Sequence, residues 1–317
     1  MTTTPAPDRF HLDDAAQRWM TTHSWNRPTW TVAELTEAKA AAGTTVSVVL
    51  PALDEEDTVG AVVDSIAPML GGLVDELIVL DSGSTDDTGI RAVAAGARVI
   101  SREQALPELA PQPGKGEVLW RSLAATTGDL IVFVDADLID PDPMFVPRLL
   151  GPLLTGSGIS LVKGYYRRPL KISGSEDASG GGRVTELVAR PLLTALRPEL
   201  GLLLQPLGGE YAGTRELLTA LRFAPGYGVE IGLLIDAYDR LGLNAIAQVN
   251  LGVRAHRNRP LTELGAMSRQ VIATLLSRCG VADSGIGLTQ FFADGDSFTP
   301  RTTEVSLADR PPMNTLR

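Results

Sequence analysis

Apolar runs of strand length alternate with amphipathic segments between residues 44 and 140. Such runs, rich in β-branched residues, are typical of buried parallel strands: TVSVVLPA (45–52), ELIVLD (76–81), ARVIS (97–101) and LIVFVDAD (130–137). Between them, helices are predicted where apolar residues recur every three or four positions, from Val59 to Ile66, over about 85–95, and from Glu117. This alternation predicts an α/β fold, a Rossmann-like and mostly parallel sheet with helices on both faces.

Outside that region the pattern is less regular. Residues 1–43 read as an N-terminal arm with a short helix from Thr31, which Trp19, Trp25 and Trp30 are expected to pack onto the body. Further helices are predicted over 184–196, 228–241 and 261–279, and the tail after Asp294 is polar and rich in proline. We therefore divide the chain into an arm (1–43), a core (44–140), a remaining core region (141–290) and a tail (291–317).

Composition narrows the class of protein. The 317 residues carry a net charge of −10, which argues against a nucleic-acid-binding protein. The single cysteine, Cys279, excludes an internal disulfide and favours a reducing compartment. Because neither a secretory signal nor an apolar stretch of roughly 18 residues is present, we expect a cytoplasmic protein without a membrane partner.

Three of the predicted strands end in polar, acidic sequences: PALDEE (51–56), DSGSTDD (81–87) and DAD (135–137). In open parallel sheets, ligands bind beyond the carboxyl ends of the strands. Asp135 and Asp137 alternate along an extended chain, so both carboxylates can face one hard cation that also binds the diphosphate of a nucleotide. Taken singly, each motif also fits a solvated loop, an acidic first helical turn, or a helix cap at Ser84 or Thr85. Three such exits in succession favour a binding site.

Basic residues gather in two places against the acidic balance of the chain, at 163–171 and 254–259, as anionic ligands would require. Arg183 and Thr185 follow three glycines at a predicted helix start, where free N–H groups attract anions. Lys115, between two glycines, could reach a diphosphate, although a surface lysine is the simpler interpretation. His256 is a candidate metal ligand or a structural histidine, and Glu230 could hold sugar hydroxyls, act as a base or begin a helix.

Eight segments together resemble a known family: VVLPALDEE, VLDSGSTDDT, PGKGEVLWRSL, VDADL, SGGGRVTELVARPLL, PLGGEYAGTRE, GYGVEIGLLID and RAHRNRPL. The family is that of the actinobacterial glucosyl-3-phosphoglycerate synthases, retaining GT-A glycosyltransferases. The resemblance spans roughly residues 10–300. Its first third is common to the wider superfamily, whereas GGGRVTE and RAHRNRPL are specific. One departure is Asp54, where the motif usually has asparagine.

The resemblance implies a reaction and a site. It implies that glucose moves from UDP-glucose to the 2-hydroxyl of D-3-phosphoglycerate with retention, in a site that needs Mg²⁺ or, as an alternative, Mn²⁺. The nucleotide-sugar-binding GT-A core would be residues 44–140, and residues 141–290 would bind the acceptor. The donor would contact Pro51, Ala52, Leu53, Glu55, Ser82, Gly83, Lys115, Asp135, Ala136, Asp137 and Tyr227. The acceptor would contact Gly182, Arg183, Thr185 and Asn258. Asp137 and His256 would bind the metal, and Leu207, Glu230 and Arg254 would line the reacting face of the sugar.

Other interpretations remain open at this point. The same fold could use another donor, such as GDP-mannose, or another acceptor, such as a polyprenyl phosphate or a polysaccharide end. A sugar-phosphate nucleotidyltransferase would normally carry a basic, glycine-rich loop after its first strand, where PALDEE is acidic. A non-catalytic nucleotide-sugar sensor would not need Asp135, Asp137 and His256. We further expect a homodimer formed through the long C-terminal helices.

Overall fold

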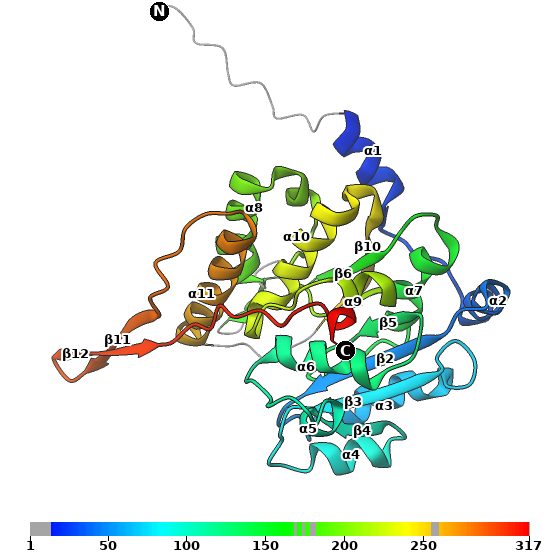
Figure 1. Ribbon diagram of the computed structural model, residues 1–317, viewed down its shortest axis with the longest axis horizontal. Helices are drawn as coiled ribbons and strands as arrows, with labels where there is room; N and C mark the ends of the chain where they lie inside the picture. The colour runs from blue at the N-terminus through cyan, green and yellow to red at the C-terminus, as the bar shows by residue number, and fades with distance from the viewer. Residues whose placement is uncertain (1–13, 168–169, 173–174, 178–181, 255–259, 317) are drawn as a thin grey trace, which may run out of the picture.

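A single eight-stranded sheet forms the centre of the molecule (Figure 1). The computed structural model describes residues 14–167, 170–172, 175–177, 182–254 and 260–316. The sheet has the order β1-β10-β6-β9-β5-β2-β3-β4. Its strands are Ser24–Trp25 (β1), Val46–Ala52 (β2), Glu76–Asp81 (β3), Arg98–Ser101 (β4), Leu130–Phe133 (β5), Leu161–Arg167 (β6), Tyr211–Thr214 (β9) and Ile246–Val253 (β10).

One reversed strand determines what reaches the ligand-binding edge of this sheet. β9 runs antiparallel to both of its neighbours, β5 and β6, whereas the other pairs are parallel. The carboxyl ends of β2, β3 and β5 therefore share one edge with the amino end of β9. The predicted mostly parallel sheet is confirmed, and the reversal brings the segment before Tyr211 to the same edge as the three acidic strand exits.

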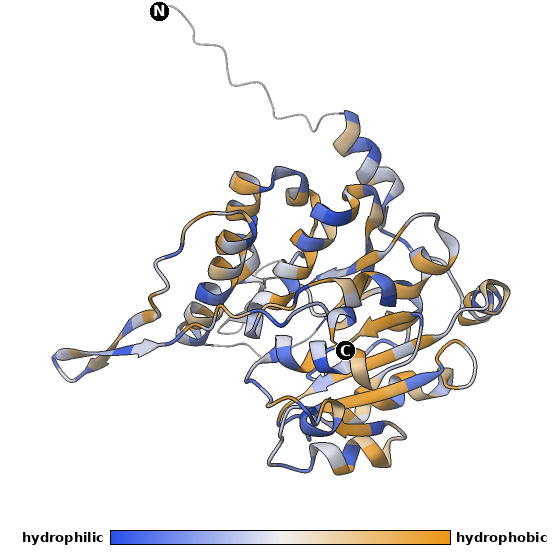
Figure 2. Cartoon of the chain, viewed as in Figure 1, coloured by the Kyte–Doolittle hydropathy of each residue, from blue (hydrophilic) through white to orange (hydrophobic). Residues whose placement is uncertain are grey.

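Helices cover both faces of the sheet, as predicted. They are Asp14–Thr22 (α1), Val32–Ala42 (α2), Val59–Ile66 (α3), Thr88–Ala94 (α4), Arg102–Ala105 (α5), Lys115–Ala125 (α6), Phe145–Thr155 (α7), Arg190–Leu196 (α8), Arg215–Ala220 (α9), Val229–Leu241 (α10) and Leu261–Arg278 (α11). One apolar core joins α2, α3 and α7 to the sheet. A second joins α6, α9, α10 and α11 to the opposite face. Successive side chains of β2 point to opposite faces of the sheet, so Val48 belongs to the first core and Val49 to the second. Figure 2 shows the hydrophobic strands that lie between the two cores.

The N-terminal arm packs against the body through its tryptophans. Trp19 is 3% exposed, and its indole Nε1 donates to the carbonyl oxygen of Ile246 at 3.2 Å. Trp25 and Trp30 pack against the first core. The predicted helix after Thr31 is α2, where Thr31 and Glu34 form a capping box. The expected docking of the arm is thus confirmed for the part that the structure describes.

Several elements differ from the sequence expectation. The segment 184–196 begins as a π-helical turn, Thr185–Ala189 (η2), before α8. Neither Ser84 nor Thr85 caps α4, because that helix begins at Thr88 and has no side-chain cap. Leu288–Asp294 (β11) and Ser297–Thr303 (β12) form an antiparallel hairpin that projects from the body (Figure 1). Its second strand, β12, lies in the segment that was expected to be a polar tail. A smaller hairpin joins Leu170–Ile172 (β7) to Ser175–Asp177 (β8).

Short 3₁₀ segments connect the larger elements: Ala67–Met69 (η1), Pro198–Leu202 (η3), Gly226–Gly228 (η4), Leu243–Ala245 (η5) and Met313–Thr315 (η6). Across the residues placed by the structure, no helix is both long and apolar enough to cross a membrane. The boundary expected near residue 140 stays a prediction. The central sheet contains strands from both sides of that position, since β5 pairs with β9.

Candidate active site

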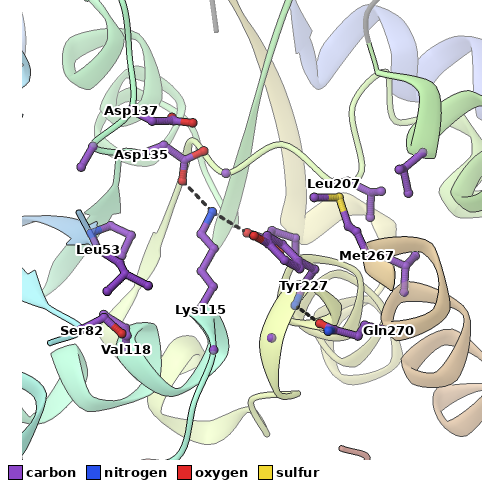
Figure 3. A pocket seen from close by; sticks show the side chains of 18 of the residues that line it. Leu53, Ser82, Lys115, Val118, Asp135, Asp137, Leu207, Tyr227, Met267 and Gln270 are labelled. Carbon is purple, nitrogen blue, oxygen red and sulfur yellow. Dashed lines mark hydrogen bonds and ion pairs between the residues drawn. The ribbon is translucent and has the colours of Figure 1, made fainter. Parts of the chain in front are cut away.

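The acidic strand exits open onto one cavity of about 560 Å³. Side chains from the end of β2, the segment after β5, the start of α6, the loop before β9, and α11 line this shared space, and Figure 3 shows several of them. Sixteen of the predicted site residues line it: Pro51, Ala52, Leu53, Glu55, Ser82, Lys115, Asp135, Ala136, Asp137, Gly182, Arg183, Thr185, Leu207, Tyr227, Glu230 and Arg254. Residues from positions 51 to 254 therefore meet in one place.

One described site residue of the prediction, Gly83, is not among the lining residues, and two others lie outside the described part of the chain. Gly83 follows Ser82 but is not among the described lining residues, and a Cβ added to it would lie 3.3 Å from the Arg102 guanidinium. His256 and Asn258 lie outside the described residues, so their predicted roles in metal and acceptor binding stay predictions.

Asp54 ties the first two strand exits together. Its φ of 53° lies in the left-handed region, which aspartate and asparagine adopt more readily than most residues. The Oδ1 atom of Asp54 accepts from the backbone N–H of Thr85 at 2.8 Å, and the N–H of Asp54 donates to Ser84 Oγ at 3.0 Å. Ser84 in turn donates to Asp81 Oδ1 at 2.6 Å. The aspartate at position 54 thus links the two loops through its side chain and its main chain, and Ser84 and Thr85 take part in this link instead of capping a helix.

Lys115 stands at the beginning of α6 between two carboxylates. Its Nζ lies 2.6 Å from Asp135 Oδ1 and 2.8 Å from Glu230 Oε1 (Figure 3 shows the bond to Asp135). Burial alone would lower the pKa of Lys115, but the charges of Asp135 and Glu230 outweigh it and raise that pKa well above its usual value. Lys115 is therefore a fixed positive charge in the cavity, not the surface lysine of the simpler interpretation.

The glycines on either side of Lys115 have a steric reason. A Cβ on Gly116 would lie 1.9 Å from the carbonyl oxygen of Ala224, and a Cβ on Gly114 would lie 2.9 Å from the backbone of Gly226. The start of α6 therefore packs directly on the loop that leads into α10. This contact brings Lys115 close to Glu230, the second residue of α10.

Arg254, at the end of β10, bridges the two aspartates of the third strand exit. Its Nη2 lies 2.9 Å from Asp135 Oδ2 and 2.7 Å from Asp137 Oδ1. Its Nε lies 3.0 Å from Glu210 Oε1, an ion pair that lacks hydrogen-bond geometry. Burial would lower the pKa of Arg254, yet Glu210 and the neighbouring aspartates raise it well above its usual value. The guanidinium is thus a cation held among three carboxylates.

Buried polar side chains near the cavity, those of Glu210, Tyr166 and Lys163, were not predicted from the sequence. Glu210 is fully buried, and its Oε2 accepts from the Tyr166 hydroxyl at 2.7 Å. Lys163 was expected to belong to a basic island for anionic ligands, and this expectation is wrong. The side chain is 3% exposed on β6, and its Nζ donates to the Gly208 carbonyl at 2.6 Å. Burial lowers the pKa of Lys163 to about 8. The position of Lys163 within the strand-forming segment LVKGYYR could have indicated that it is buried.

Three of the predicted acceptor residues, Gly182, Arg183 and Thr185, line the same cavity. Gly182 has a φ of 82°, which glycine adopts without strain, and its carbonyl accepts from the N–H of Glu186 at 3.0 Å. Arg183 and Thr185 follow at the start of the π-helical turn. Tyr227 is held against α11, because its N–H donates to Gln270 Oε1 at 2.8 Å (Figure 3).

α11 supplies wall residues that the sequence analysis did not single out: Leu264, Met267, Gln270 and Val271. Gly209 and Gly226 also line the cavity. The amphipathic pattern of α11 predicted the helix but gave no indication of which apolar residues face a ligand. Gly209 and Gly226 could have been found from the sequence, because they lie in the segments PLGGEYAGTRE and GYGVEIGLLID.

The carboxylates of Asp135 and Asp137 fit a hard divalent cation that is also bound by the phosphates of a substrate. Asp135 and Asp137 place carboxylate oxygens at the cavity wall, and Mg²⁺ is often bound by one or two carboxylates together with substrate phosphates. In the portion of the chain that the structure covers, no cluster of three or more His, Cys, Asp or Glu side chains is placed to hold a metal alone. The two carboxylates therefore match a site that a nucleotide diphosphate completes.

A mostly parallel α/β sheet with a D-x-D sequence at one strand exit, a lysine facing it and a cavity at that edge of the sheet defines a GT-A glycosyltransferase. The model of the family described as Glycosyl transferase family 2 matches residues 47–171, which contain these exits. The chain belongs to the glucosyl-3-phosphoglycerate synthase family. It is 81% identical over 300 residues to the glucosyl-3-phosphoglycerate synthase of Mycolicibacterium smegmatis, covering 95% of this chain and 98% of that protein. The synthase of Petrotoga mobilis is 41% identical over 297 residues, covering 90% and 91% of the two chains.

Solved structures of a family member agree with this assignment. The Mycobacterium tuberculosis enzyme in complex with Mn²⁺, UDP-glucose and phosphoglyceric acid has a TM-score of 0.85 and 70% identity, covering 93% of this chain and 98% of that chain. The same enzyme in complex with Mg²⁺ and UDP has a TM-score of 0.86 and 70% identity, covering 93% and 99%. The expected family and fold are thus confirmed.

Proposed function

We propose that this chain transfers glucose from UDP-glucose to the 2-hydroxyl of D-3-phosphoglycerate, with Mg²⁺ as cofactor and Mn²⁺ as an alternative. The observation that carries the proposal is the cavity in which Lys115 and Arg254 face the carboxylates of Asp135 and Asp137. The family membership of the chain, and the substrates bound to the M. tuberculosis enzyme, support the same reaction.

The donor half of the proposed site is the wall formed by β2, β3 and β5. Pro51, Ala52 and Leu53 would hold the nucleoside, together with Glu55, Ser82, Gly83 and Tyr227. Asp135, Ala136 and Asp137 would face the diphosphate, and Asp137 with His256 would hold the metal. The metal would screen the charge of the leaving group. Lys115 supports this assignment because it carries a fixed positive charge at 2.6 Å from Asp135.

The acceptor half would be Gly182, Arg183, Thr185 and Asn258. D-3-phosphoglycerate carries a phosphate and a carboxylate, and Arg183 can bind such groups through a planar pair of N–H donors. The N–H groups at the start of the turn 185–189 would add to this anion binding. Because Arg183 and Asp137 line the same cavity, the acceptor hydroxyl can approach the sugar carbon.

We propose retention by attack on the same face of the sugar. The bond from glucose C1 to the β-phosphate oxygen would break to give a short-lived ion pair. The bond from C1 to the acceptor oxygen would then form on the same face, and the hydroxyl proton would pass to the departing diphosphate. Leu207, through its main-chain carbonyl, Glu230 and Arg254 would line the reacting face. Glu230 is 5% exposed and ion-paired to Lys115 at 2.8 Å. Such pairing suits a carboxylate that positions a sugar better than one that forms a covalent adduct.

A transfer assay tests the function directly. UDP-glucose, GDP-mannose and ADP-glucose are each incubated with D-3-phosphoglycerate or glycerate in the presence of Mg²⁺, and the released nucleotide is measured. We expect UDP release with UDP-glucose and D-3-phosphoglycerate, and an α-linked product by the anomeric proton coupling. A preference for another donor or acceptor would contradict the substrate assignment. A β-linked product, or a sugar adduct on Glu230 in the intact-protein mass spectrum, would contradict the same-face mechanism.

The expected homodimer and the cytoplasmic location stay predictions. The hairpin β11–β12 carries Phe291 and Phe298, which are 68% and 67% exposed. Light scattering on the purified chain would show whether it forms a dimer in solution.

A further inference from the structure

Arg310, in the tail, joins two elements that are far from it in sequence. It forms an antiparallel bridge with Phe223, in which the N–H of Arg310 donates to Phe223 O at 2.9 Å and the N–H of Phe223 donates to Arg310 O at 3.1 Å. Its guanidinium binds Glu117 through two contacts, Nε to Oε2 at 2.5 Å and Nη2 to Oε1 at 2.9 Å. The tail therefore connects the loop before α10 to α6.

The helix side of this connection is nearly inaccessible to water. Glu117 is 2% exposed, and it also accepts from Arg121 Nε at 2.5 Å. The Arg310 guanidinium lies 5.0 Å from the ring centre of Trp120, whose Nε1 donates to the Pro311 carbonyl at 2.8 Å. Charge-assisted hydrogen bonds in such surroundings are among the stronger polar contacts in proteins. The geometry at Glu117 is thus set in part by the tail.

The two elements that Arg310 joins are those that enclose Lys115. Glu117 lies two positions after Lys115, and Phe223 directly precedes Ala224, the residue against which Gly116 packs. The same loop continues through Gly226 and Tyr227, which line the cavity, to Glu230, which pairs with Lys115. A change in the separation of Glu117 and Phe223 would therefore move Lys115 relative to Tyr227 and Glu230.

We infer that Arg310 is a positioning residue for the donor: by holding Glu117 and Phe223 together, it sets the place of Lys115 and Tyr227 in the cavity. The inference rests on the proposed function, in which Lys115 and Tyr227 face the nucleotide sugar. Arg310 does not line the cavity itself as described. Its effect is transmitted through α6 and the loop 223–228, and the described contacts of Arg310 do not include residues 182–185.

The test compares Arg310→Ala with a matched control, Arg301→Ala. Arg301 lies on β12, where its guanidinium lies over the Phe292 ring, and this hairpin projects away from α6, the helix that carries Glu117 (Figure 1). We expect Arg310→Ala to raise the KM for UDP-glucose about tenfold and to leave the KM for D-3-phosphoglycerate within about twofold of the wild type. Arg310→Lys keeps the charge but not the paired contact with Glu117, so its KM for UDP-glucose should lie between those of the wild type and Arg310→Ala. Arg301→Ala should behave as the wild type.

The outcomes separate the inference from its alternatives. An unchanged donor KM in a folded Arg310→Ala variant, or an equal rise in both KM values, would overturn the inference and leave a structural role. If Arg310→Ala does not melt cooperatively, the test uses Arg310→Lys instead. A KM for UDP-glucose equal to that of the wild type in Arg310→Lys would also overturn the inference. If the wild type fails to glucosylate D-3-phosphoglycerate, the proposed function fails instead. Calorimetric titration with UDP and Mg²⁺ then tests Arg310 without turnover, and equal affinities of wild type and variant would overturn the inference.

Discussion

Gly209 offers a sharp test of the cavity, because a methyl group there would collide with a single functional carboxylate. A Cβ on Gly209 would lie 2.3 Å from Asp135 Oδ2 and 2.6 Å from both Cγ and Oδ1. Ordinary contacts begin at 3.4 Å, so the closest contact would have to lengthen by 3.4 − 2.3 = 1.1 Å. All three atoms are too close, so rotation of the carboxylate does not relieve the overlap. Asp135 must therefore leave the position in which it contacts Lys115 and Arg254.

The expected result of Gly209→Ala is a loss of activity in a folded protein. A displacement of about 1 Å in a catalytic group can cost about 100-fold in rate, and we expect a loss of that order in kcat. Steady-state kinetics of UDP release gives the rate, and thermal unfolding verifies the fold. Gly201→Ala is the matched control, because its Cβ would meet its nearest neighbour, Thr194 Oγ1, at 3.6 Å. Wild-type kcat in Gly209→Ala would refute a role for the position of Asp135.

Three further predictions concern the metal, the acceptor and a buried charge. Asp137→Ala should abolish transfer, and EDTA should do so reversibly; full activity of the dialysed enzyme in EDTA would contradict the proposed metal dependence. Arg183→Ala should weaken D-3-phosphoglycerate binding by about 2–5 kcal/mol while UDP binding is nearly unchanged, and an unaltered acceptor KM would remove Arg183 from the acceptor site. Lys163 has a pKa of about 8 when folded against a usual value of 10.5, so between these values the unfolded chain binds more protons and the free energy of unfolding rises with pH. Relative to Lys163→Met, the wild type should gain about 2–3 kcal/mol in urea unfolding between pH 7 and pH 10, and parallel pH curves would contradict the burial argument.

The part of the fold that the sequence could predict is the part with local signals. The strands β2, β3 and β5 are continuous apolar runs, and their acidic exits identified the binding edge. β9 has only four residues, YAGT, and its antiparallel position between β5 and β6 depends on partners about 80 and 50 residues away. Pairing over such distances leaves no periodic pattern, so the reversal that brings Leu207 and Gly209 to the site could not be predicted from local sequence.

The candidate site divides in the same way. Asp135 and Asp137 were found from their spacing and their place after a strand, and the structure brings them together with Lys115 and Arg254. Glu210 and Lys163 were missed or misplaced, because a charged residue normally predicts an exposed position. Their burial is compensated by Tyr166, Arg254 and a main-chain carbonyl. Those partners become neighbours only when the sheet has formed.

The short strand β1 also has a consequence for synthesis of the protein. Ser24 and Trp25 cover the outer edge of β10, pairing with Gln248 and Val249. Their partner strand is made 224 positions later, which at ribosomal speed is a delay of about 10 to 45 s. During that time the arm leaves the ribosome without a partner. Its strand of two residues offers only a short edge for pairing with other nascent chains, whereas Trp19 stays without its contact to Ile246 until the far end of the sheet arrives.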